Sequence, residues 1–208
     1  DNAVTDADAG ACRIVLLNQI FYAKDLENLT VLALGDSYFA GQGLPQDQVW
    51  LHLMARKYNM DMKNYGIGGS TISDCENGSD PMVNRYSTLI AENPVADIIL
   101  VEGGRNDSSK KAVIGNVALE NQDKTTYAGA LNIIIDDLQK TYPNAMIVCV
   151  TPWNFPDREG YLSSQDYGTA MEQIAALQGV KCIRAYDPDV SGVDMQNPDF
   201  PKEYSMAA

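Results

Sequence analysis

The stretch Thr30-Val31-Leu32-Ala33-Leu34-Gly35-Asp36-Ser37 joins a short apolar run to a sharp polar turn. The run over 30–34 has no alternation of apolar and polar residues. It therefore predicts a strand covered on both faces, as in parallel sheets that lie between helices. The polar turn follows where such a strand would end at the edge of its sheet.

Four further runs of strand length follow, and segments with helical periodicity separate them. The expected strands are 30–34, 63–67, 96–101, 145–150 and 180–185. The expected helices are 45–58, 81–91, 125–140 and 164–177, with 108–123 and 187–208 irregular. This alternation predicts an α/β fold, with a mainly parallel five-stranded sheet between two helical layers.

Size and charge narrow the classes of function. The chain has 208 residues, which suits one domain over 1–208, with residues 1–28 as an N-terminal capping segment that is helical over 12–28. The net charge of −13 disfavours nucleic acid and anionic membranes as partners. No apolar run approaches the roughly 20 residues that span a bilayer. The sequence does not indicate an oligomeric state.

The cysteines and the single histidine give no pattern typical of a metal site. Cys149 and Cys182 fall in expected strands and are interpreted as small apolar core residues. Cys12 and Cys75 could form a disulfide in an oxidising compartment, and the sequence does not decide whether they do. We expect no metal and no cofactor.

Three polar clusters each follow an expected strand: 35–37, 64–71 and 104–107. Ligands of parallel α/β sheets bind beyond the carboxyl ends of the strands, so these clusters are expected to converge. Their chemistry is complementary. Ser37 offers a nucleophilic hydroxyl, the glycines allow a backbone N–H to approach a reacting oxygen, and Asn106 offers a neutral amide donor.

The sequence resembles the SGNH (GDSL-type) hydrolase superfamily of esterases and lipases. Gly35-Asp36-Ser37 is similar to its first block, and the blocks at 64–71 and 104–107 follow in order. The resemblance covers roughly residues 30–186 and implies a flavodoxin-like three-layer sandwich. It also implies that Ser37 is the nucleophile, and that Gly69 and Asn106 donate to the oxyanion of an acyl-serine reaction.

The sequence departs from the family in one respect. The family places a catalytic histidine near its C-terminus, three residues after an aspartate, and no Asp-x-x-His occurs here. His52 falls opposite the apolar stripe of its expected helix and is interpreted as a surface residue. Either the protein continues past Ala208 to the missing pair, which we favour, or it is a pseudoenzyme that lacks the base. Asp187, Asp189 and Asp194 lie where the family places its acid, and none is selected.

Each site residue also has a structural interpretation. Ser37 and Asn106 could cap the segments that follow them, and Gly69 could merely supply a positive φ angle. Asp36 is interpreted as a turn hydrogen-bonder rather than an acid, and Asp107 as structural. Arg105 would either contact substrate or pair with a carboxylate.

The aromatic residues near the expected site have two interpretations as well. Trp153, Phe155 and Tyr161 would stack on a sugar or acyl group, or only pack their loop, and the second is favoured. For Tyr38, packing is also favoured over lining the entrance.

The sequence as a whole predicts a serine esterase for carboxylic esters. The acidic surface favours small or carbohydrate-borne acyl groups. The alternative is a catalytically incomplete module that binds a glycan or acyl group.

Overall fold

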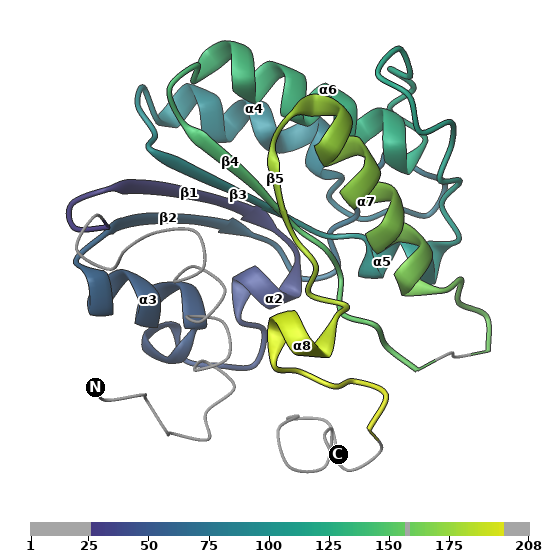
Figure 1. Ribbon diagram of the computed structural model, residues 1–208, viewed down its shortest axis with the longest axis horizontal. Helices are drawn as coiled ribbons and strands as arrows, with labels where there is room; N and C mark the ends of the chain where they lie inside the picture. Colours follow the sequence, from purple (N-terminus) through teal and green to yellow (C-terminus); the bar gives the residue numbers. More distant parts are fainter. Residues whose placement is uncertain (1–25, 157–158, 198–208) are drawn as a thin grey trace.

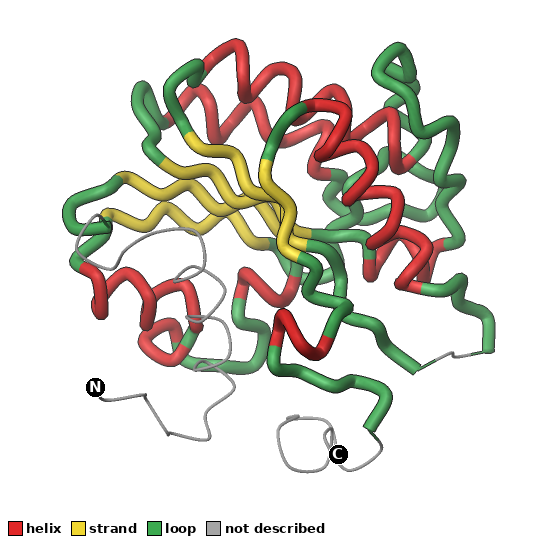
Figure 2. Tube along the Cα trace, viewed as in Figure 1, coloured by secondary structure: helices red, strands yellow, loops and turns green. Residues whose placement is uncertain are grey.

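A computed structural model describes residues 26–156 and 159–197. Five strands form one sheet in the order β2-β1-β3-β4-β5, and all four neighbouring pairs are parallel. The strands are β1 (Thr30–Gly35), β2 (Asp61–Gly66), β3 (Ile98–Glu102), β4 (Met146–Val150) and β5 (Lys181–Ile183). The predicted α/β class and the five-stranded parallel sheet are therefore confirmed (Figure 2).

Helices cover both faces of the sheet, which makes a three-layer arrangement (Figure 1). One layer holds α4 (Met82–Glu92), α6 (Tyr127–Thr141) and α7 (Ser164–Gln178). The other holds α2 (Ser37–Ala40), α3 (Trp50–Tyr58) and α8 (Pro188–Ser191), while α5 (Arg105–Lys110) follows β3.

Alternate residues of β1 divide between the two hydrophobic cores. Leu32 and Leu34 belong to the core under α4, α6 and α7, whereas Val31 and Ala33 belong to the core beside α3. All four are fully buried. Burial on both faces explains why the strand is apolar throughout, because neither face meets water.

The expected helix over 45–58 is divided in two. A 3-10 turn over Gln46–Gln48 precedes α3, and Val49 between them is extended. Val49 is fully buried, and a Cβ added at Gly41 would lie 2.2 Å from one of its methyl groups. Packing of Val49 over Gly41 therefore interrupts the helix, which local periodicity does not reveal.

Two segments expected to be irregular contain short helices. Residues 108–110 are the end of α5, and 188–191 form α8, which Asp187 caps by accepting from the Asp189 N–H. Of the predicted N-terminal helix over 12–28, only 26–28 fall inside the described residues; they are not helical, and 27–28 form a turn. Cys149 is buried as expected, whereas Cys182, its partner in the strand register, is only partly buried.

Candidate active site

The polar clusters follow three neighbouring strands at one edge of the sheet. β1 lies between β2 and β3, so the segments after these strands meet beside α2. Ser37 is the first residue of α2, and Asp36 caps this helix by accepting a hydrogen bond from the Tyr38 N–H at 2.9 Å. The strand-to-helix turn places Ser37 at the surface, half-buried, whereas Asp36 is fully buried.

Two glycines allow α2 to lie directly on the ends of β1 and β2. Gly35 and Gly66 are register partners at the last position of the two strands. A Cβ at Gly66 would lie 2.3 Å from the Ala40 backbone nitrogen, and one at Gly35 would lie 2.6 Å from the Phe39 ring. Any larger residue would displace the helix that carries Ser37. The sequence alone does not reveal this pair, because the two glycines become neighbours only through the strand register.

The loop after β2 passes close to Ser37. An ideal Cβ on Gly68 would lie 3.9 Å from the Cβ of Ser37. Gly69 has a φ of +80°, and nothing lies within 4 Å of the position its Cβ would occupy. The positive φ favours glycine, and the open space beside it leaves room for a ligand.

Asn106 joins the three segments. Its Nδ2 donates to Oδ2 of Asp36 at 2.9 Å and to the backbone carbonyl of Ser70 at 3.0 Å. Asn106 thus lies between the turn after β1 and the loop after β2. Both N–H groups of its amide have acceptors in this state, so contact with a substrate oxygen requires one of them to be exchanged.

Asp107 is fully buried and contacts the loop that follows β2. Its carboxylate accepts from the N–H groups of Ile72 and Ser73 at 2.9 and 3.0 Å, and from the Ser73 hydroxyl at 2.6 Å. Burial raises the pKa of Asp107, while these hydrogen bonds oppose the rise. Its contacts fit the structural interpretation.

The Asp36 carboxyl is a buried acid at the centre of the cluster. Burial raises its pKa to about 6, although hydrogen bonds from the Tyr38 N–H, from Glu102 and from Ser37 lower it. The Asp36 N–H in turn donates to Oε2 of Glu102 at 3.1 Å. Asp36 thus acts as a helix cap and as the acceptor that holds Asn106.

Arg85 on α4 is a member of the cluster that the sequence analysis missed. Its guanidinium donates to the carbonyls of Tyr65 at 2.7 Å and Gly35 at 2.9 Å, and to Oγ of Ser70 at 3.0 Å. An arginine on an amphipathic helix is ordinarily read as a solvated charge. Only the position of α4 against the ends of β1 and β2 reveals these contacts.

Aromatic rings lie on the other flank, next to the turn that carries Ser37. The Tyr38 ring is 4.9 Å from that of Trp153 and 5.9 Å from that of Phe155. The Arg105 guanidinium lies over Phe155 at 4.3 Å and over Tyr161 at 4.8 Å. Trp153 is buried, in line with loop packing, whereas Phe155 and Tyr161 are half-buried. These contacts connect the loop after β4 to Tyr38, which follows Ser37, and to Arg105, which precedes Asn106.

His52 is the third residue of α3 and is half-buried rather than fully exposed. Within residues 26–156 and 159–197, no hydrogen bond or ion pair connects it to Ser37. In the C-terminal segment, Asp187 caps α8 and Asp194 accepts from the Gln196 N–H at 3.0 Å. Both carboxylates therefore serve local turns.

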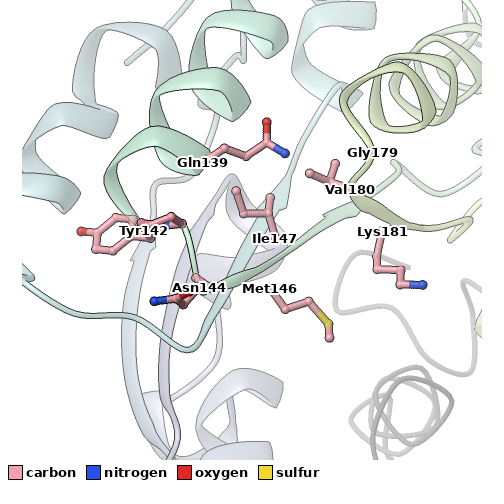
Figure 3. Close-up of a pocket in the computed structure, with 10 residues that line it drawn as sticks. Gln139, Tyr142, Asn144, Met146, Ile147, Gly179, Val180 and Lys181 are labelled. Carbon is pink, nitrogen blue, oxygen red and sulfur yellow. The ribbon is translucent and has the colours of Figure 1, made fainter.

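A separate hollow of about 470 Å³ is lined by residues at the C-terminal end of α6 and at the start of β4 and β5 (Figure 3). It lies where β4 and β5 begin, whereas Ser37 follows the end of β1. It is lined by Gln139, Tyr142, Pro143, Asn144, Ala145, Met146, Ile147, Gly179, Val180 and Lys181. It is not part of the site around Ser37.

The fold and the site define the chain as an α/β protein with a serine at the carboxyl edge of a parallel sheet. The pattern of the GDSL-like lipase/acylhydrolase family matches residues 33–203. The chain belongs to this family, and the predicted SGNH (GDSL-type) relationship is confirmed. No curated protein matches the chain.

Solved structures share the fold. One crystal structure has 26% sequence identity and a TM-score of 0.74, and 88% of each chain is covered. A structure from Bacteroides uniformis, described as that of a GDSL-like lipase, has 22% sequence identity and a TM-score of 0.61, and the match covers 86% of this chain and 96% of the other. AlinE4, an SGNH-hydrolase family esterase, has 21% identity and a TM-score of 0.56 over 83% and 82%. In the described residues, no helix is long and apolar enough to cross a membrane.

Proposed function

We propose that the protein is a serine esterase that hydrolyses small or carbohydrate-borne acyl esters through an acyl-serine intermediate. One observation carries the proposal. Ser37, the Gly69 loop and Asn106 belong to three separate chain segments, and the hydrogen bonds of Asn106 tie these segments together. Family membership supports the same reaction class.

In this mechanism Ser37 Oγ bonds to the carbonyl carbon, and its proton passes to a general base. The carbonyl oxygen becomes an oxyanion held by the N–H groups of Ser37 and Gly69 and by the Asn106 amide. Each such donor lowers the barrier by about 2.7–4 kcal/mol. The ester C–O bond then breaks, and the alcohol leaves with the proton. Water releases the acyl group as a carboxylic acid and returns a proton to Ser37.

The preference for small or carbohydrate-borne esters rests on charge and on the aromatic flank. The net charge of −13 is unfavourable for a negatively charged lipid surface. Phe155 and Tyr161 are half-buried beside Arg105, so part of each side chain remains able to contact a sugar ring. Both features favour a neutral substrate with a polar alcohol component.

The test compares p-nitrophenyl acetate hydrolysis by the wild type, Ser37→Ala and Ser87→Ala. Ser87 is an exposed serine on α4 and serves as the matched control. We expect Ser37→Ala to abolish hydrolysis and labelling by a fluorophosphonate, and Ser87→Ala to retain both. Equal rates for the wild type and Ser37→Ala would remove the nucleophile assignment.

The substrate class is tested separately with acetylated xylan and p-nitrophenyl palmitate. We expect a higher kcat/KM for the acetyl esters than for the palmitoyl ester, and the reverse order would contradict the preference. His52→Gln is included and should retain activity, because His52 is not hydrogen-bonded to Ser37 in the described residues.

A binding module without hydrolysis is the second candidate. It is favoured by the Asn106 amide, whose two N–H groups already have protein acceptors. This candidate predicts that acetylated oligosaccharides bind while neither ester hydrolysis nor fluorophosphonate labelling occurs. The labelling experiment therefore separates the two functions.

A further inference from the structure

Arg85 contacts several backbone groups around the candidate site from a helix that carries none of its reacting groups. Its Nη2 donates to the Gly35 carbonyl at 2.9 Å and to Oγ of Ser70 at 3.0 Å. Its Nη1 donates to the Tyr65 carbonyl at 2.7 Å, and its Nε to the Asp80 carbonyl at 3.2 Å. One side chain thus holds the ends of β1 and β2 and the loop that follows β2.

Ser70 connects Arg85 to the two proposed oxyanion donors, because it follows Gly69 in the chain and accepts a hydrogen bond from Asn106. Its side chain donates to the Asp80 carbonyl at 2.6 Å, and its N–H donates to the Ile67 carbonyl at 3.1 Å. Its carbonyl accepts from Asn106 at 3.0 Å, and the residue is fully buried. Each polar group of Ser70 has a partner, so Ser70 is held in place. Its N–H closes a turn on the Ile67 carbonyl, and the central peptide of this turn, between Gly68 and Gly69, carries the Gly69 N–H.

We propose that Arg85 is a positioning residue that fixes the Gly69 N–H for oxyanion binding. It acts through the Ser70 hydroxyl and through the Gly35 and Tyr65 carbonyls. The inference rests on the proposed esterase function. Oxyanion donors accelerate a reaction when they are already oriented before charge develops, so a fixed loop lowers the barrier without tightening substrate binding.

The charge and shape of the guanidinium suit this role. Burial lowers the pKa of Arg85 to about 10, while Asp80 and Asp36 oppose the decrease, so Arg85 remains positively charged at neutral pH. A planar guanidinium directs its N–H groups to several carbonyls at fixed angles, which a lysine ammonium does not reproduce.

The kinetic test uses p-nitrophenyl acetate with Arg85→Gln, Arg85→Lys and the control Arg56→Gln. Arg56, on α3, donates to the Asp47 carbonyl at 2.8 Å, so the control also removes an arginine–carbonyl contact. For Arg85→Gln we expect kcat to fall about 10–100-fold with KM changed less than about threefold. Arg85→Lys should recover part of kcat, and Arg56→Gln should remain within about twofold of wild type.

Inhibition by phenylboronic acid, which forms a tetrahedral adduct with a serine hydroxyl, gives a second measurement. We expect its inhibition constant to rise in Arg85→Gln by about the factor by which kcat/KM falls. Equal changes in kcat for Arg85→Gln and Arg56→Gln, or a loss that appears in KM alone, would overturn the proposal.

Amide hydrogen exchange tests whether Arg85 fixes the loop that carries Gly69, and it does not depend on catalysis. We expect faster exchange of the Ile67 and Ser70 amides in Arg85→Gln, and unchanged exchange in Arg56→Gln. Unchanged exchange in Arg85→Gln would contradict the inference. Activity that does not depend on Ser37 would instead contradict the proposed function, so the two failures are distinguishable.

Discussion

Replacing Gly66 by alanine tests whether α2 depends on the glycine pair beneath it. The added Cβ would lie 2.3 Å from the Ala40 backbone nitrogen and 2.7 Å from the Phe39 carbonyl carbon. Ordinary contact begins at 3.4 Å, so the helix and the strand must separate by about 1 Å. Both neighbouring atoms belong to the backbone, and no side-chain rotation relieves the contact.

Ser37 lies on the helix that must move. Misplacement of a reacting group by 1 Å costs about 10²-fold in rate, so kcat/KM for p-nitrophenyl acetate should fall by about that factor. The free energy of unfolding should fall by about 1–3 kcal/mol, as expected for overpacking. The measurements are steady-state kinetics, the rate of fluorophosphonate labelling and urea denaturation.

Gly179→Ala is the matched control. Gly179 has a φ of +70°, with no heavy atom within 4 Å of its Cβ position, and it caps the end of α7. This change introduces backbone strain of about 1–2 kcal/mol without a contact at α2, so kcat should not change. Wild-type kinetics and stability in Gly66→Ala would refute the reasoning, as would equal losses of kcat/KM in the two variants.

Three further changes probe the cluster. Asp107→Ala leaves the donors of Ile72 and Ser73 without their acceptor, so urea denaturation should show a loss of about 3–5 kcal/mol, and a loss below about 1 kcal/mol would contradict this. Asn106→Ala should reduce kcat for p-nitrophenyl acetate by about 10²–10³ with little change in KM, and a change confined to KM would exclude an oxyanion role. The folded-state pKa of Asp36 is raised from 3.8 to about 6, so its ionisation destabilises the fold. The wild type should therefore lose about 3 kcal/mol relative to Asp36→Asn as the pH rises from below 3.8 through 6, and equal slopes in urea denaturation would refute this.

The sequence allowed the three central strands, β1, β3 and β4, to be predicted because each is mainly apolar and buried. The edge strands β2 and β5 are partly exposed and give a weaker pattern. Apart from the helix divided at Val49, the element ends shifted by no more than two residues, since tertiary contacts decide where a strand or helix stops. The break at Val49 was not predictable, because it arises from packing over Gly41. Local periodicity carries no information about that contact.

The positions of the candidate site residues were predictable because each follows a strand of a parallel sheet. The sequence placed Ser37, Gly69 and Asn106 at one edge, and the structure brings their segments together there. The contacts of Arg85 were not predictable, since α4 resembles an ordinary amphipathic helix. The pairing of Gly35 with Gly66 likewise exists only once the strand register is fixed.

The hydrogen bond from Asn106 to Asp36 spans 70 residues of chain, and the one from Arg85 to Gly35 spans 50. We expect such contacts to form late, because each one must close a long loop before it contributes any stability. During refolding, the helical circular dichroism signal should therefore return before esterase activity does. Recovery of turnover would then report on the joining of β1, β2 and β3, and a chain halted before that step would be inert.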